Sequence, residues 1–285
     1  MKNGMRARRR IGNAATYGIL SILSVVWLLP IVYLVLMSLR AEKGAWLDGY
    51  VLPKAYTLDN YINLFTNTRL FNYPRWFGNT LLVAVLSCLI STIFILFTAY
   101  AFSRLRFKTR RPIMNIALVL GMFPGFMSMI AVYHLVKIVG LEKNLAALVL
   151  VYSGGAALTY YIIKGFFDTI PKAMDEAAYL DGCTRWQTFY MITLPMSRPI
   201  ITYTVLTTFM APWVDFIMSS VIMKDNADGY TMALGLFRML ERENITEYYT
   251  SFCAGAVLVS IPISILFLIM QRNYVEGVTG GAVKG

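Results

Sequence analysis

Apolar residues gather into six long windows, and shorter polar stretches separate them. The windows lie at roughly Tyr17–Leu39, Phe77–Phe102, Pro112–Tyr133, Leu145–Ile163, Pro199–Met223 and Thr250–Gln271. Crossing the hydrocarbon core of a bilayer, about 30 Å thick, takes about 20 helical residues. The pattern therefore predicts an all-α integral membrane protein with six transmembrane helices.

Composition agrees with this pattern. The chain is 58% hydrophobic and only 14% charged, whereas soluble domains carry roughly 25% charged residues. Five windows hold no Asp, Glu, Lys, Arg or His, and the fifth in order holds one such residue, Asp215. Three cysteines without a C-x-x-C pair and a single histidine exclude a disulfide framework and a metal site.

The first window has two interpretations. Its basic start resembles a signal peptide, but the apolar region of a signal is only about 7–15 residues long. This window is longer and lacks an A-x-A-like cleavage site. We therefore expect a retained helix.

Basic residues predict the orientation. The amino terminus, without any acid, carries Lys2, Arg6, Arg8, Arg9 and Arg10. The loop after the second window, also without any acid, carries Arg104, Arg106, Lys108, Arg110 and Arg111. Cytoplasmic loops are enriched in Lys and Arg, so both stretches and both termini are expected in the cytoplasm of a bacterial cell. This explains the net charge of +11 without nucleic acid.

The predicted organisation has three parts. These are a basic cytoplasmic amino terminus (1–16), a six-helix transmembrane domain (17–272) containing a long cytoplasmic loop (164–198), and a cytoplasmic tail (273–285). The net acidic loop at 224–249 falls outside. We expect a short helix at Thr231–Leu240 within it.

Four prolines lie inside the apolar windows, namely Pro30, Pro124, Pro212 and Pro262. Gly121-x-x-Pro124-Gly125 is expected to break the third window. A proline removes a backbone hydrogen bond that lipid cannot replace. Each proline is therefore either a packing kink or a break that lines a wet pathway.

The long cytoplasmic loop contains strong local signals. Pro171–Leu180 is helix-compatible, and Gly182 suits the left-handed residue that ends a helix. Thr184 followed by Gln187 matches a capping box for a second helix. That helix is expected to run until Pro195. The loop thus predicts two helices joined by a sharp elbow.

The elbow could serve as a contact for another protein. Ala177 and Ala178 are small enough to allow a close approach, and Glu176 offers a charge to a basic partner. Trp186 and Phe189 could pack back on the bundle. An ordinary amphipathic helix pair at the membrane surface explains the same residues.

A longer motif favours the first interpretation. The string E-A-A-x-x-D-G, followed after nine residues by I-x-L-P, resembles the coupling signature of permease subunits of ABC importers. The matching residues are Glu176, Ala177, Ala178, Asp181, Gly182, Ile192, Leu194 and Pro195. The stretches Thr57–Tyr61, Asn79–Ala84 and Ala99–Phe107, together with the tail from Gly277, resemble carbohydrate-uptake permeases of the maltose G-subunit type. Cys183 departs from the small residue usual there.

This resemblance implies a type I ABC importer permease with a cytoplasmic coupling helix. Such permeases pair with a second homologous permease, two ATPase subunits and an extracytoplasmic sugar-binding protein. The chain has no G-x-x-x-x-G-K-[ST] motif, so the resemblance implies that the partner ATPase binds ATP and Mg²⁺. We expect no cofactor in this chain and no enzymatic activity of its own.

A second candidate site lies within the fifth window. A charge inside the bilayer costs about 2.5–3.5 kcal/mol on insertion scales, so Asp215 is expected to face the bundle interior. Together with Trp213 and Pro124 it could line the translocation path or contact the second permease. A structural hydrogen bond between helices is the alternative.

Two other classes of membrane protein fit less well. An ion-coupled secondary transporter usually carries several ionisable residues at mid-membrane, and this chain has one. A membrane enzyme needs a nucleophile–base set, which the chain lacks. Within the favoured class, glycerol phosphate or a polyol is the alternative to a sugar.

Overall fold

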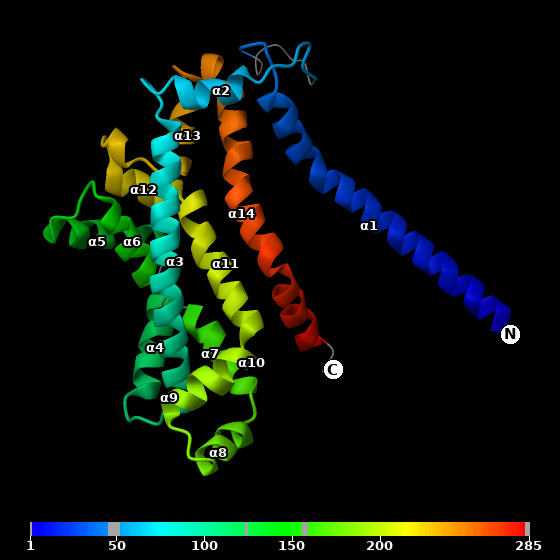
Figure 1. Cartoon of the computed structure of the whole chain (residues 1–285), viewed down its shortest axis with the longest axis vertical. Helices are drawn as coiled ribbons and strands as arrows, with labels where there is room; N and C mark the ends of the chain where they lie inside the picture. Colours follow the sequence, from blue (N-terminus) through cyan, green and yellow to red (C-terminus); the bar gives the residue numbers. More distant parts are fainter. Residues whose placement is uncertain (1, 45–51, 123–124, 156–158, 283–285) are drawn as a thin grey trace. The chain divides into compact units, whose positions relative to one another are not determined.

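The computed structural model describes residues 2–44, 52–122, 125–155 and 159–282 (Figure 1). Over these residues the backbone is helical with no named strand, and Arg40 and Tyr56 form an isolated antiparallel bridge. The elements are α1 (Lys2–Ser38), α2 (Asp59–Thr66), α3 (Tyr73–Arg104), α4 (Arg110–Gly121), α5 (Gly125–Ile138), α6 (Leu145–Gly154), α7 (Thr159–Thr169), α8 (Lys172–Leu180), α9 (Arg185–Thr188), the π-helix η2 (Phe189–Thr193), α10 (Leu194–Met196), α11 (Arg198–Val214), α12 (Phe216–Met223), the 3₁₀ helix η3 (Ala227–Gly229), α13 (Met232–Met239) and α14 (Ile245–Ala282).

Helices cover the six predicted windows, with breaks inside three of them. Gly12–Ser38, Tyr73–Arg104 and Ile245–Arg272 are each long and apolar enough to cross a membrane without interruption. The fourth window is the pair α6 and α7, bent by 41°, and the fifth is the pair α11 and α12, bent by 56°. Among the described residues, five spans therefore meet the length test when each bent pair counts once.

The third window is divided into α4 and α5. The first helix ends at Gly121 and the second begins at Gly125, which are the bounds of the break predicted from the sequence. Pro124 itself lies outside the described residues. Each half is too short to cross a bilayer alone, since crossing takes about 20 residues.

The chain forms two compact units. One contains residues 1–72 and 238–258, and the other contains residues 73–237 and 259–285. In the larger unit α3 packs against α6, α7 and α11. The buried face of α3 carries small residues at helical spacing, including Ala84, Ser87, Ser91 and Ala99, and small residues allow membrane helices to approach closely.

Towards its carboxyl end, α3 lies beside a cluster of larger buried side chains. The cluster contains Ile95, Leu96, Ala99, Tyr100, Phe102, Tyr160, Ile163, Phe167, Ile170 and Phe189. Its members come from α3, α7, the turn after α7 and η2. The loop at 164–198 is thus packed onto the end of this core.

In the smaller unit a buried asparagine joins three segments. The amide nitrogen of Asn60 donates to the carbonyls of Ser38 (3.0 Å) and Arg40 (2.7 Å). The hydroxyl of Thr250, on α14, donates to the Asn60 amide oxygen at 2.8 Å. This network accounts for an asparagine in the Thr57–Tyr61 stretch, because only a side chain with both donors and an acceptor makes all three bonds.

We expect Asn60→Ala to destabilise the protein by about 2–4 kcal/mol, because buried polar groups would lose their partners. The melting temperature of the purified protein measures this loss. Asn63→Ala is the matched control, since Asn63 lies on the same helix and is exposed. Equal melting temperatures for the two variants would contradict the proposed role of Asn60.

Candidate functional site

The loop at 164–198 begins within α7, and its first separate helix is α8, which lies at the end of the bundle where α7 stops (Figure 1). Two residues at the end of α3 hold the connection. Ser103 Oγ donates to Asp168 Oδ1 at 2.7 Å, and Lys164 Nζ pairs with the other oxygen of the same carboxylate. Arg104 Nη2 donates to the carbonyl of Ile170 at 2.9 Å. The turn into α8 is therefore fixed to α3.

A buried ion pair then attaches α8 itself. Arg104 Nε lies 2.9 Å from Asp175 Oδ2, and the two side chains are only 4% and 9% exposed. Burial raises the pKa of the Asp175 carboxyl, and the Arg104 guanidinium offsets part of this effect. Removing one partner of a buried pair costs about 3–5 kcal/mol, because the other charge stays buried and unpaired.

The two faces of α8 differ. Asp175 and Ala178 are buried against the chain, whereas Glu176 and Ala177 are exposed. Leu180, at the end of the helix, is 89% exposed. Of the two alanines proposed to allow close approach, Ala177 faces outward. Ala178 instead serves the internal packing of α8.

The elbow follows the geometry predicted from the sequence. Gly182 has a φ of +83°, a conformation that strains any residue with a side chain. The N–H of Cys183 bonds the carbonyl of Ala178 at 2.9 Å, and the N–H of Gly182 bonds that of Tyr179 at 3.1 Å. These two bonds form a Schellman ending for α8. Asp181 is exposed at the carboxyl cap.

The second helix starts at the predicted capping box. The Thr184 hydroxyl accepts from the Gln187 N–H at 3.3 Å, and the Gln187 side chain accepts from the Thr184 N–H at 2.7 Å. Pro171 is the N-cap of α8, so the helix begins at Lys172, one residue after the start predicted from the sequence. The local sequence therefore fixes both helix ends at the elbow.

Aromatic side chains pack the second helix onto α3, as predicted for Phe189. This residue is 3% exposed, and its ring centre lies 4.7 Å from that of Tyr100 and 5.4 Å from that of Phe97. Tyr100 also donates to the carbonyl of Arg185 at 3.1 Å. Trp186 contacts Phe97 but remains 57% exposed.

The prediction that the second helix ends at Pro195 is wrong. After Thr188 the chain widens into the π-helix η2 and continues through α10, which includes Pro195. Pro195 lies in the first turn of α10, where a missing N–H costs little. This helical segment ends at Ser197, the C-cap of α10. Ile192 and Leu194 are half-buried, and Leu194 packs against the core cluster.

The membrane aspartate lies at the break between α11 and α12. Its backbone leaves the helical region (φ −84°, ψ 97°), and its carboxylate accepts from the Met218 N–H at 3.0 Å. Asp215 is thus the N-cap of α12. The Tyr152 hydroxyl, on α6, donates to its other oxygen at 3.1 Å and lies 3.5 Å from Ser219 Oγ. The carboxylate joins the two bent spans.

Trp213, two residues before Asp215, is 3% exposed. Its ring centre lies 5.3 Å from Phe77 and 6.1 Å from Phe209. Its buried indole nitrogen has no hydrogen-bond partner among the residues that the structure describes. Pro124, the third residue of this candidate site, lies outside the described residues.

The loop after α12 folds back onto the start of α3. Arg75 pairs with Asp228 at 2.8 Å, and Asn79 donates to the carbonyls of Asp228 and Tyr230. The expected short helix is α13. The Thr80 hydroxyl caps it by accepting from the Met232 N–H at 2.7 Å.

Sequence reasoning missed the residues that fix the elbow to the bundle. Arg104 counted only as one of the basic residues that orient the protein, and Asp175 was not singled out. Tyr152 was likewise not paired with Asp215. Each contact joins elements far apart in the chain, and Tyr152 and Asp215 are separated by 63 positions. A single sequence carries no signal for such pairs.

Comparison with known proteins gives a consistent answer. Residues 91–280 match the family model described as "Binding-protein-dependent transport system inner membrane component". The chain is 34% identical to the galactooligosaccharides transport system permease protein GanQ of Bacillus subtilis, over 99% of both chains. It is 32% identical to the maltodextrin permease MalD of Streptococcus pneumoniae over the full length of both, and 32% identical to the maltose/maltodextrin permease MalG of Escherichia coli K12 over 90% of each.

Solved structures show the same fold. A chain of a bacterial ABC transporter involved in import of the acidic polysaccharide alginate superposes with a TM-score of 0.76, at 23% identity, over 92% of this chain and 96% of that one. A chain of the MetNI methionine ABC transporter gives 0.54 at 17% identity, over 70% and 92%. The described helices therefore adopt the type I importer permease fold.

We expect Asp215→Ala to lower stability by about 2–3 kcal/mol, because a helix cap and the acceptor for a part-buried hydroxyl are both lost. Asp215→Asn keeps one acceptor oxygen and should lose less. The melting temperature of the purified complex orders the variants. Ser220→Ala is the control, since its exposed hydroxyl bonds only its own helix. Full uptake by Asp215→Asn would show that the charge is dispensable.

Proposed function

Because the chain belongs to the family of binding-protein-dependent transport system inner membrane components, we propose that it is the permease subunit of an ATP-driven sugar importer. Relatives that match it over most or all of their length are permeases for galactooligosaccharides and maltodextrins. These names support an oligosaccharide as the substrate class. Glycerol phosphate or a polyol is the alternative within the same fold.

The proposed coupling runs through α8. Its tip exposes Leu180 almost fully, beside the outward-facing Ala177 and Glu176. An apolar side chain on a short, rigid helix suits insertion into a cleft of a separate ATPase subunit, because rigid anchors lose little entropy on docking. This exposed tip, on a helix otherwise fixed to the bundle, is the observation that best supports the proposal.

Movement of α8 would then reach the membrane helices. The ion pair between Asp175 and Arg104 connects α8 to α3. The hydrogen bond from Tyr100 to the Arg185 carbonyl connects α9 to α3 as well. The loop also continues covalently into α7 and α11. Closure of two ATPase subunits on ATP would thus shift the permease between inward- and outward-facing states, each selected by its partners.

The proposed orientation places α8, both termini and the α3–α4 loop in the cytoplasm of a bacterial cell, by the excess of basic residues there. The α12–α13 region then faces outward, where a sugar-binding protein would dock. Since Arg75 and Asn79 hold residues 228–230, deletion of this segment would also disturb α3. A second permease completes the assembly.

The sugar path is proposed to run beside the break at Asp215. The carboxylate, Tyr152 and Ser219 form a polar group within otherwise apolar spans. Hydroxyl and carboxylate groups suit sugar hydroxyls, whereas Trp213 is buried against Phe77 and Phe209 and offers no aromatic face to a ligand. Breaks in membrane helices are tolerated where they line such a path.

The transport activity is tested on the whole importer. The chain is co-purified with its ATPase and second permease, reconstituted, and supplied with its binding protein. Galactooligosaccharides and maltodextrins are then compared with glycerol phosphate. Sugar-stimulated ATP hydrolysis with uptake is the expected result. Stimulation by glycerol phosphate alone would identify the alternative substrate class, and uptake without nucleotide would overturn the proposal.

We expect Gly182→Ala to lower sugar uptake per ATP hydrolysed several-fold. A side chain at φ +83° costs roughly 1–2 kcal/mol and would loosen the elbow. No atom lies within 4 Å of the added methyl, so the chain should still fold. Gly165→Ala, an equally uncrowded change inside α7, is the control. Normal coupling in both variants would refute the role of the elbow.

Leu180→Glu should reduce the ATPase subunits that co-purify with the permease by about tenfold, the loss expected for removing one apolar anchor. Because the side chain is 89% exposed, the change should leave membrane insertion intact. Leu70→Glu, 62% exposed on a different loop, is the control. If both variants retain the ATPase equally, Leu180 is not a docking residue.

A further inference from the structure

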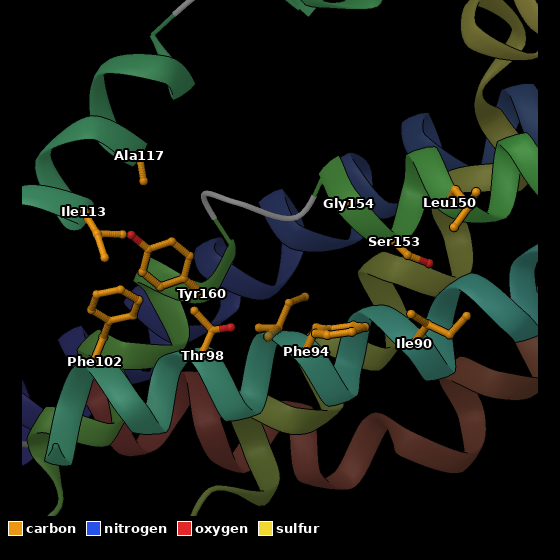
Figure 2. Close-up of a pocket in the computed structure, with 11 residues that line it drawn as sticks. Ile90, Phe94, Thr98, Phe102, Ile113, Ala117, Leu150, Ser153, Gly154 and Tyr160 are labelled. Atoms are coloured by element: carbon orange, nitrogen blue, oxygen red, sulfur yellow. The ribbon is translucent and has the colours of Figure 1, made fainter. Parts of the chain in front are cut away.

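Two cavities follow one another along the helix pair α3 and α4. The first has a volume of about 490 Å³ and is lined from α3, α4, α6 and α7 by Ile90, Phe94, Ile95, Thr98, Phe102, Ile113, Ala117, Leu150, Ser153, Gly154 and Tyr160 (Figure 2). The second has a volume of about 200 Å³ and is lined by Ser103, Arg104, Arg106, Arg110, Lys172, Asp175, Glu176 and Tyr179. We refer to them as the apolar cavity and the charged cavity.

The order of lining residues shows that the cavities are neighbours. On α3 the apolar cavity ends at Phe102 and the charged cavity begins at Ser103. On α4, Arg110 lines the charged cavity, while Ile113 and Ala117 line the apolar one. These three positions are spaced by three and four residues, so they share one face of the helix.

The charged cavity is electropositive. Four cationic side chains line it, against the two carboxylates of Asp175 and Glu176. Arg104 is the most informative of them, because its side chain is 4% exposed and its Nη1 has no hydrogen-bond partner among the described residues, as is also true of Asp175 Oδ1. A buried guanidinium nitrogen without a partner is costly, and an anion in the cavity would satisfy it.

The apolar cavity has the opposite character. Its walls are mostly aliphatic and aromatic, and two buried hydroxyls, Ser153 Oγ and Tyr160 Oη, have no hydrogen-bond partner within the part of the chain that the structure describes. Figure 2 shows Tyr160 beside Phe102 and Ile113, and Ser153 near Leu150. Phe102 is followed in the chain by Ser103, which lines the charged cavity. A sugar has too many hydroxyls for such walls, whereas a hydrocarbon chain suits them.

The dimensions fit a lipid. The helical rise places Arg104 about 21 Å along α3 from Ile90, and one leaflet contributes about 15 Å of hydrocarbon. Arg104 is also the last residue of a membrane-length helix, where lipid headgroups are found. We propose that the two cavities bind one anionic phospholipid, with its phosphate at Arg104, Arg106 and Arg110 and an acyl chain in the apolar cavity.

Such a lipid would adjoin the coupling helix. Lys172, Asp175 and Glu176 of α8 line the same cavity as the phosphate-binding arginines. Occupancy would therefore steady the contact between α8 and α3. This consequence, and the choice of the cytoplasmic leaflet, rest on the proposed function, whereas lipid occupancy itself does not.

The test is native mass spectrometry of the intact importer from nanodiscs of phosphatidylglycerol and phosphatidylcholine. The wild type should retain one phosphatidylglycerol. Arg106→Gln with Arg110→Gln should weaken it about 30-fold, since each basic residue near an anionic headgroup contributes about fivefold. Lys108→Gln, on the same loop but outside the cavity lining, should retain the lipid.

A second variant tests the acyl chain separately. Ala117→Phe fills the apolar cavity and should also displace phosphatidylglycerol, with the arginines intact. The proposal is overturned if Lys108→Gln loses as much lipid as the double variant, or if Ala117→Phe retains it fully. Displacement by inorganic phosphate alone would identify a free-phosphate site instead. Lost sugar uptake with normal lipid in Ala117→Phe would assign the apolar cavity to the sugar.

Discussion

The buried pair of Arg104 and Asp175 is the interaction on which the rest of the arrangement depends. It joins the last residue of a membrane-length helix to a short helix that the bilayer itself cannot hold. Removing two charges from water is expensive, and a single contact repays this only in part. Stability alone does not account for this ion pair, since two apolar side chains of similar volume would stabilise the contact as well. What the pair provides is one defined position for α8, because among the described residues it is the one ion pair that either buried charge makes.

Local signals in the sequence predicted the structure wherever a single turn of chain decides it. Gly182 ends α8 because few other residues tolerate its φ, and Thr184 with Gln187 starts α9 because each satisfies the N–H of the other. The apolar windows predicted the spans for a similar reason, since their length is set by the membrane rather than by neighbouring helices. The break at Gly121 and Gly125 belongs to the same group.

Features that depend on distant neighbours were not predictable. The helix continues through Pro195 because the π-turn before it shifts the hydrogen-bond pattern, and the packing of Phe189 on Tyr100 accompanies that turn. The fifth span bends at Asp215 rather than at Pro212, because the carboxylate caps the next helix and meets Tyr152. In both cases the sequence indicated that a proline or a charged residue lies within a helical segment. Where the chain turns depends on the residues that contact this segment in the folded protein, and these are distant in the sequence.

The same buried arginine connects the two proposals. Asp175 engages Arg104 through one nitrogen and the Ile170 carbonyl engages another, which leaves Nη1 buried and without a hydrogen-bond partner among the described residues, on a side chain that lines the charged cavity. An anion bound there would share the guanidinium with Asp175, and would thereby bear on the pair that positions α8. A lipid can do this without occupying the position of Leu180, which does not line the charged cavity, but Glu176 borders both the cavity and the tip. In this proposal, docking of the ATPase subunit at Leu180 and lipid binding in the charged cavity are compatible, and both act on α8 through Arg104.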